Sequence, residues 1–187
     1  MSCTSPLPTQ QQHRIVKDTT KVNKLSIAAS RSSEGRRLID SLTSEERELF
    51  KSQNILIAED NMVARKLLYK QLKQLGFNSV VCAINGQEAI DMYTERKPGY
   101  FKMAFFDHHM PKCDGVQATK TIRKMEKERN LDIRLPIVTL TADIQDSAKE
   151  LCMNAGFDQY LTKPMSNTTF AAVLNQFCCD ALHETKE

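Results

Sequence analysis

The sequence has no long apolar run, and none of its apolar stretches approaches the ~20 residues that a helix needs to cross a bilayer. Its first residues, which include Gln10-Gln11-Gln12, have no apolar centre of the kind that signal peptides carry. These two absences argue against a membrane protein and against a secreted one. We therefore expect no membrane partner and a location in the cytoplasm, with the nucleus as the alternative.

The cysteines lack the spacing of a metal site. No CxxC pair and no regular Cys/His pattern occurs among Cys3, Cys82, Cys113, Cys152, Cys178 and Cys179. We therefore expect reduced thiols of the kind found in cytosolic and nuclear proteins. The composition is otherwise that of a soluble globular protein, with 41% hydrophobic and 26% charged residues. The length of 187 residues allows one ordinary domain plus additional sequence.

The amino-terminal part lacks aromatic residues and sustained periodicity. It is rich in Ser, Thr, Gln and Lys, so it cannot bury enough apolar surface to offset the entropy cost of ordering. Residues 1–37 carry seven Lys and Arg against two acids, whereas the whole chain has a net charge of only +3. The positive excess therefore belongs to this segment. Without interleaved aromatic residues, the segment is not expected to bind nucleic acid.

A short helix is expected where this extension approaches the regular part of the chain. Thr43 and Glu46 have the spacing of a capping box, in which each side chain satisfies a backbone N–H at the start of a helix. We therefore expect residues 1–50 to form a basic, largely disordered extension that contains one short helix near 44–51.

From about residue 54 the pattern becomes regular. Short apolar runs, typical of buried parallel strands, alternate with segments whose apolar residues repeat at helical spacing. Strands are expected at 54–58, 79–83, 102–107, 135–140 and 158–161. Helices are expected at about 62–75, 86–96, 114–129, 143–154 and 166–179. Five such repeats predict an α/β domain over 53–180, with helices on both faces of a parallel sheet, and a short tail at 181–187.

Polar side chains stand at the ends of four of these strands. Glu59 and Asp60 come after the first strand, Asp107 ends the third, Thr141 follows the fourth and Lys163 follows the fifth. Because the carboxyl ends of parallel strands point the same way, we expect these side chains to meet at one edge of the sheet. Carboxylate oxygens are ligands that Mg²⁺ prefers. The pattern predicts a site that binds Mg²⁺ and carries a phosphoryl group on Asp107.

Each of these residue types suits a particular role. Asp60 and Asp107 would bind the metal directly, and Glu59 would reach it through water. A carboxylate such as Asp107 is a competent nucleophile toward phosphorus when a metal neutralises the phosphoryl oxygens. The Thr141 hydroxyl would donate a hydrogen bond to the transferred phosphoryl group. The Lys163 ammonium would pair with the Asp107 carboxylate before phosphorylation and with a phosphoryl oxygen afterwards.

This set resembles the receiver domain of two-component response regulators, most of all those attached to or served by eukaryotic hybrid histidine kinases. The matching motifs are Glu59-Asp60-Asn61, Asp107 with Met110-Pro111 and Asp114-Gly115, Thr141-Ala142 and Lys163-Pro164. The resemblance implies a doubly wound, flavodoxin-like fold with a five-stranded sheet in the order 2-1-3-4-5 and five helices. It also implies that Asp107 takes a phosphoryl group from the phosphohistidine of a histidine-containing phosphotransfer protein or histidine kinase, and later loses it to water.

The same resemblance assigns further roles. Tyr160 matches the aromatic switch position: it would turn inward as Thr141 moves toward the phosphoryl group, and the surface of the fourth helix and fifth strand would change. His109 would give its backbone carbonyl to Mg²⁺. His108 and His109 form an unusual pair after the acceptor. We hypothesise that His109 and Asp143 gate the attacking water and so set the lifetime of the phosphoryl group.

We therefore expect a signalling phosphoacceptor, not a turnover enzyme, whose output passes through contacts with an unidentified protein effector. The alternative is a Mg-dependent phosphatase of the haloacid dehalogenase type, which also uses an Asp nucleophile at a strand end. That family needs a second acid two residues after the nucleophile, where this chain has His109. A flavin-binding protein is disfavoured because Glu59-Asp60 replace a hydroxyl-rich phosphate loop. A domain used only for binding is disfavoured by the complete set of acids, Thr and Lys.

Overall fold

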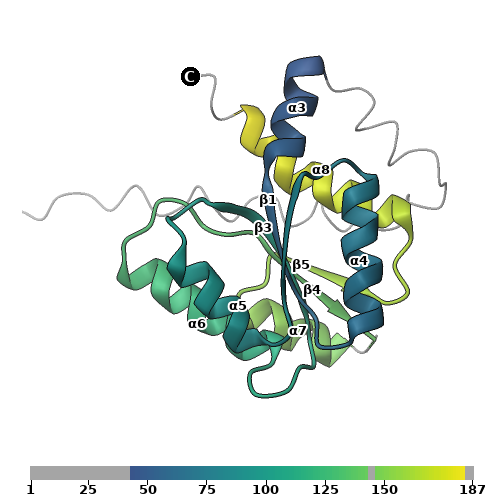
Figure 1. Ribbon diagram of the computed structural model, residues 1–187. Helices are drawn as coiled ribbons and strands as arrows, with labels where there is room; N and C mark the ends of the chain where they lie inside the picture. Colours follow the sequence, from purple (N-terminus) through teal and green to yellow (C-terminus); the bar gives the residue numbers. More distant parts are fainter. Residues whose placement is uncertain (1–42, 143–145, 184–187) are drawn as a thin grey trace, which may run out of the picture.

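The computed structural model describes residues 43–142 and 146–183, so residues 1–42 of the predicted extension and Asp143 lie outside the described residues. The described chain contains one parallel sheet in the order β2-β1-β3-β4-β5, as predicted (Figure 1). Its strands are β1 (Asn54–Ala58), β2 (Ser79–Ala83), β3 (Phe101–Asp107), β4 (Ile137–Thr141) and β5 (Gln159–Thr162). The described helices are α3 (Ser44–Ser52), α4 (Met62–Gln74), α5 (Gly86–Glu95), α6 (Gly115–Glu128), α7 (Asp146–Ala155) and α8 (Asn167–His183).

Helices cover both faces of the sheet. Figure 1 shows α4 and α8 on one side and α5, α6 and α7 on the other. Successive residues of a strand point to opposite faces, so Leu56 and Ala58 belong to the core under α5–α7, whereas Ile55 and Ile57 belong to the core under α4 and α8. All four side chains are fully buried. This two-sided burial explains why β1 reads as a continuous apolar run.

The described part of the chain has six helices, one more than the five helices of the predicted repeats. The additional helix, α3, begins at the predicted capping box of Thr43 and Glu46. It is packed on the domain: Phe50 is fully buried with its ring centroid 4.6 Å from that of Phe77. The Gln53 amide then donates to the Cys178 carbonyl of α8 (3.1 Å). The core therefore includes a helix that the sequence pattern assigned to the extension.

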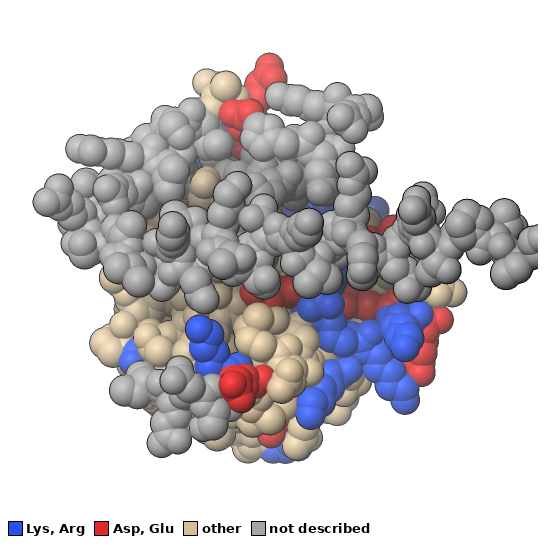
Figure 2. Space-filling view, turned by 180° about the vertical axis from the view of Figure 1, so that it is seen from behind, with Lys and Arg blue, Asp and Glu red and all other residues tan. Residues whose placement is uncertain are grey.

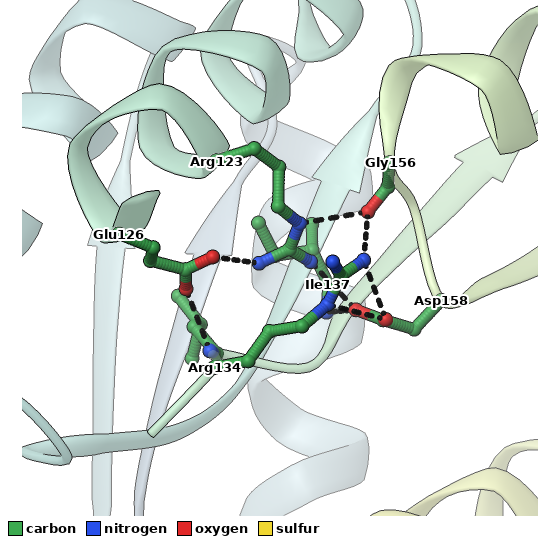
Figure 3. A network of polar contacts seen from close by, with 7 residues as sticks. Arg123, Glu126, Arg134, Ile137, Gly156 and Asp158 are labelled. Carbon is green, nitrogen blue, oxygen red and sulfur yellow. Dashed lines mark hydrogen bonds and ion pairs between the residues drawn. The ribbon is translucent and has the colours of Figure 1, made fainter. Parts of the chain in front are cut away.

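A polar network lies at the opposite end of β4 and β5 from Thr141 and Lys163 (Figure 3). The Arg123 guanidinium of α6 pairs with Glu126 (2.7 Å) and Asp158 (2.7 Å) and donates to the Gly156 carbonyl (2.8 Å). Arg134 also binds Asp158 and the Gly156 carbonyl. The network joins α6 to the turn between α7 and β5.

The same carboxylates set the start of β4. The Leu135 backbone N–H donates to Glu126 (2.7 Å), and the Ile137 backbone N–H donates to Asp158 (2.8 Å). Side chains thus take the place of a strand partner here, so β4 begins two residues later than predicted.

On the face shown in Figure 2, the described surface carries charges of both signs. Lys and Arg side chains gather at one edge of that face, with Asp and Glu side chains beside them. Much of the remaining described surface in this view carries no charge. None of the helices in the described part of the chain is both long and apolar enough to cross a bilayer.

Candidate functional site

The acids lie at the carboxyl edge of neighbouring strands. Ala58 at the end of β1 pairs with Phe106 of β3, so Glu59 follows directly beside Asp107. The Glu59 backbone N–H continues the ladder by donating to the Ala83 carbonyl of β2 (3.2 Å). The chain then turns into α4, whose first free N–H groups are capped by the side chain of Asn61. This sharp strand-to-helix turn leaves Asp60 exposed at the edge.

The structure brings the three predicted acids together. One carboxylate oxygen from each of Glu59, Asp60 and Asp107 lies within 4.8 Å of the others. Glu59 is buried, Asp107 is partly buried and Asp60 is exposed. Three carboxylates so close together, with water access on one side, suit a hard divalent cation such as Mg²⁺ that keeps several waters.

Lys163 joins the same cluster. Its ammonium lies 2.6 Å from the Glu59 carboxylate and 3.0 Å from the Asp107 carboxylate. Its backbone N–H donates to the Thr141 carbonyl (2.7 Å), which extends the pairing of β4 with β5 to this position. One ammonium among three carboxylates leaves an excess of negative charge, and a divalent cation would neutralise it.

The environment shifts two pKa values in the cluster. Burial raises the pKa of Glu59, and the Asp107 charge raises it further, while the hydrogen bond and charge of Lys163 partly oppose this. Burial alone would lower the pKa of Lys163. The hydrogen bonds and charges of Glu59 and Asp107 more than offset burial, so this pKa is raised and the ammonium stays charged.

Thr141 and Tyr160 lie on the strands next to the acceptor. Thr141 is the last residue of β4, fully buried, one position beyond Leu140, the register partner of Asp107. Tyr160 of β5 pairs with Thr139 and packs, half-buried, against the core under α5–α7. Of the two predicted switch residues, Thr141 therefore lies on the strand next to β3, and Tyr160 lies one strand further out.

The loop after Asp107 is held close to the acceptor. Gly115 at the start of α6 donates its N–H to the His108 carbonyl (3.2 Å). A Cβ atom at Gly115 would lie 2.2 Å from the Asp107 carbonyl oxygen, so only glycine fits there. Asp114 caps α6, as predicted, by accepting from the Gln117 N–H (2.7 Å). His109 is exposed, and its ring lies edge-on to the His108 ring (centroids 4.3 Å apart).

Two contacts near the site were not predicted from the sequence. Arg65 of α4 donates through one nitrogen to the backbone carbonyls of Glu59 (2.6 Å) and Asp60 (3.0 Å). The His108 ring nitrogen Nδ1 lies 3.3 Å from the Cys152 Sγ of α7. For Arg65, a usable signal was its position one helical turn after Asn61, which faces it back toward the loop. For Cys152 no signal was available, because its partner is far away in the sequence.

The comparisons with known proteins agree with this geometry. Residues 55–175 match the model of the response regulator receiver domain. Among curated relatives, the chain is 44% identical over 136 residues to the peroxide stress-activated histidine kinase mak2 of Schizosaccharomyces pombe. That match covers 73% of this chain but only 6% of the kinase, so the chain spans a small part of that relative's length.

Solved structures give the same picture. One neighbour is the receiver domain of Ssk1 of Saccharomyces cerevisiae, crystallised with the histidine phosphotransfer protein Ypd1. It has a TM-score of 0.65 at 30% identity, covering 71% of this chain and 92% of that one. Another is the receiver domain of the histidine kinase CKI1 of Arabidopsis thaliana, complexed with Mg²⁺ and BeF₃⁻. Its TM-score is 0.62 at 29% identity, covering 72% of this chain and 94% of that one.

Proposed function

The chain belongs to the response regulator receiver domain family, and on that premise we propose that Asp107 is its phosphoacceptor in a Mg²⁺-dependent phosphorelay. Receiver domains of this family are signalling phosphoacceptors and not turnover enzymes. The donor would be a histidine-containing phosphotransfer protein or a histidine kinase, since a related receiver was crystallised with such a phosphotransfer protein.

One observation carries the proposal: Lys163 contacts both Glu59 and Asp107, and the Asp107 carboxylate lies in the three-acid cluster. A nucleophilic carboxylate needs its own charge and that of the incoming phosphoryl group offset. A bound Mg²⁺ would supply part of this neutralisation. It would be held by Glu59, Asp60, Asp107 and the backbone carbonyl of His109. The charged Lys163 supplies the rest of the neutralisation from the end of β5.

The proposed transfer is a direct displacement. A carboxylate oxygen of Asp107 attacks the phosphorus of the donor phosphohistidine, the phosphorus–nitrogen bond breaks and an acyl phosphate forms. The donor imidazole leaves with the electron pair of that bond and takes a proton from solvent. Lys163 then exchanges its contact with the Asp107 carboxylate for phosphoryl oxygens, and Thr141 donates its hydroxyl to the same group.

A donor protein must reach Asp107, so its docking surface should adjoin the site. The first two turns of α4, which follow Asp60, expose Met62, Val63 and Leu67 by 57%, 72% and 58%. Ile84, directly after β2, is also exposed. Large apolar side chains exposed together beside a polar site are typical of protein contacts. We assign this surface, the α4 face, to the phosphodonor.

The output surface would lie on α7 and β5. Leu151 and Met153 of α7 are exposed by 48% and 42%, and Tyr160 is half-buried under the same helix layer. Inward rotation of Tyr160 as Thr141 binds the phosphoryl group would change this surface, which we call the α7 face. The effector that reads it is unidentified.

The phosphatase alternative is not supported. The matching family model is that of receiver domains, and the solved neighbours quoted above are receiver domains as well. The general acid that such a phosphatase needs two residues after Asp107 is replaced by His109, which carries no carboxylate.

Phosphorylation by a small-molecule donor tests the proposal. Incubation of the chain with acetyl phosphate and Mg²⁺ should add one phosphoryl group, detected by intact mass and located on Asp107 by borohydride trapping. Asp107→Asn should remain unmodified, and omission of Mg²⁺ should abolish labelling. Labelling of Asp107→Asn at the wild-type level, or rapid hydrolysis of unrelated phosphate esters, would contradict a phosphoacceptor role.

The decay of the same adduct tests the lifetime hypothesis. If the His109 side chain gates the attacking water, His109→Ala should change the half-life of the phosphoryl group, and an unchanged half-life would remove this role. Asp143 lies outside the described residues, so its part in gating rests on the sequence alone and Asp143→Ala tests it in the same way.

A further inference from the structure

The residue after the acceptor is fixed by three different elements. The His108 backbone N–H donates to the Leu140 carbonyl of β4 (3.1 Å), and its carbonyl accepts from the Gly115 N–H of α6 (3.2 Å). Its ring reaches the Cys152 thiol in the second half of α7, with 3.3 Å between Nδ1 and Sγ. Either the thiol or the ring nitrogen supplies the proton of this hydrogen bond, according to the tautomer of the imidazole.

The carboxyl end of α7 is attached to the polar network at the start of β4 and β5. The Gly156 carbonyl, directly after the helix, accepts hydrogen bonds from Arg123 (2.8 Å) and Arg134 (2.9 Å), as Figure 3 shows. Arg123 is in turn held by the Glu126 and Asp158 carboxylates. A helix anchored just beyond its last residue responds to a shift of Cys152, one turn before that anchor, by tilting its first turns.

We propose that His108 is a positioning residue that transmits the state of Asp107 to α7 through its hydrogen bond with Cys152. This inference rests on the proposed function, because it requires Asp107 to be the group that changes. It adds a side-chain route from the acceptor to the α7 face that does not involve Thr141 or Tyr160. The strand alternation explains the geometry: His108 points to the face opposite Asp107, which is the face that α7 covers.

Because of its surroundings, a displacement of the Cys152 side chain is passed on to neighbouring residues of α7. Cys152 is fully buried in a close-packed core, where a displaced side chain moves its neighbours. The adjoining residues on either side, Leu151 and Met153, are exposed. A movement of Cys152 by the His108 ring therefore alters the position of the two apolar side chains that form the α7 face.

Hydrogen–deuterium exchange of the full chain tests this route, with Mg²⁺ and BeF₃⁻ as the phosphoryl mimic. In the wild type, the mimic should change exchange over residues 146–155. Cys152→Val keeps the volume but removes the hydrogen bond, and it should reduce this change by about fivefold or more, the lower end of typical coupling between sites. BeF₃⁻ binding by fluorine NMR should be retained, because Cys152 does not touch the site.

Three comparisons make the result decisive. Cys152→Ser keeps a hydrogen-bonding group and should retain the α7 response, whereas Cys178→Val removes an equally buried thiol from α8 and should leave the response intact. His108→Phe combined with Cys152→Val should lose no more of the α7 response than either substitution alone.

A full α7 response in Cys152→Val, or an equal loss in Cys178→Val, overturns the inference. No α7 response in the wild type despite BeF₃⁻ binding removes the α7 output surface and the inference together, while absence of BeF₃⁻ binding contradicts the phosphoacceptor function itself.

Discussion

Arg65 shows how a residue outside the acid cluster can govern it. Its guanidinium holds the backbone of both Glu59 and Asp60 and so fixes where their carboxylates point. We expect Arg65→Ala to weaken Mg²⁺ binding by about tenfold, as loss of a supporting contact around a metal site often does. Isothermal titration calorimetry of the full chain at constant ionic strength measures this directly.

Whether Arg65→Ala weakens or tightens Mg²⁺ binding shows whether Arg65 acts by positioning the loop or by its positive charge. If Arg65 acted only as a positive charge beside a cation site, its removal would tighten Mg²⁺ binding, because like charges repel. Lys66, the next residue and exposed, is the matched control, and Lys66→Ala should change the affinity little or increase it slightly. Tighter binding in Arg65→Ala would show that the hydrogen bonds to the loop do not position the acids.

The residues of the site differ in how far the sequence could predict them. Asp107, Glu59 and Lys163 stand at strand ends, so the parallel topology alone predicts that they meet, and the structure places them within contact distance. The partners of His108 and Arg65 depend on side-chain direction and helix position. The contacts of Arg65 are local, so its position one helical turn after Asn61 was a usable signal. The contact of His108 with Cys152 follows from no local pattern, because it exists only after the sheet and helices have packed.

At the scale of elements, local patterns predicted the helix α3 but not its packing on the domain. Its capping box predicts a helix, but the burial of Phe50 against Phe77 depends on where α3 folds back on the α4–β2 turn. Strands β1 and β2 have the predicted bounds because each is an apolar run bounded by polar turn residues. The start of β4 was wrong because the carboxylates of Glu126 and Asp158 take over its first N–H groups.

We expect Phe50→Ala to destabilise the domain by about 3–5 kcal/mol, the usual cost of removing a fully buried phenylalanine. Urea unfolding followed by circular dichroism measures the change. Leu49→Ala, on the same helix but half exposed, is the control and should cost less than about 1 kcal/mol. Equal, small effects of the two substitutions would mean that α3 does not belong to the cooperative unit.

The burial of Tyr93 on α5 predicts a pH dependence of stability. Burial raises the pKa of Tyr93, as does the charge of Glu126, while Arg123 and Arg129 partly oppose this. The folded state therefore keeps the phenol proton at a pH where the unfolded chain loses it. Stability from this group is complete below about pH 10 and is lost as pH rises through the raised pKa.

Tyr93→Phe should accordingly flatten the decline of unfolding free energy at alkaline pH. Urea titrations between about pH 9 and pH 11 on both proteins give the comparison. Tyr69→Phe, at an exposed tyrosine of α4, should leave the alkaline slope unchanged. A slope in Tyr93→Phe equal to that of the wild type would assign the pH dependence to other groups.

At the scale of the whole molecule, the two proposed contact surfaces lie in different layers. The α4 face belongs to the helix layer of α4 and α8, and the α7 face to the layer of α5, α6 and α7, with the sheet between them (Figure 1). The acceptor stands at the sheet edge that both layers share. A donor on one layer therefore need not compete with an effector on the other.

This separation predicts that substitutions on the two layers have different effects on the phosphorylation of Asp107 by its donor protein. Val63→Glu and Leu67→Glu place charges on the α4 face and should slow phosphotransfer from a histidine-containing phosphotransfer protein by about tenfold or more, the usual scale for a key interface residue. Their reaction with acetyl phosphate should remain near the wild-type rate, because the acids and Lys163 are unchanged. Leu151→Glu on the α7 face should transfer normally, so slow transfer in this variant as well would place the donor across both layers.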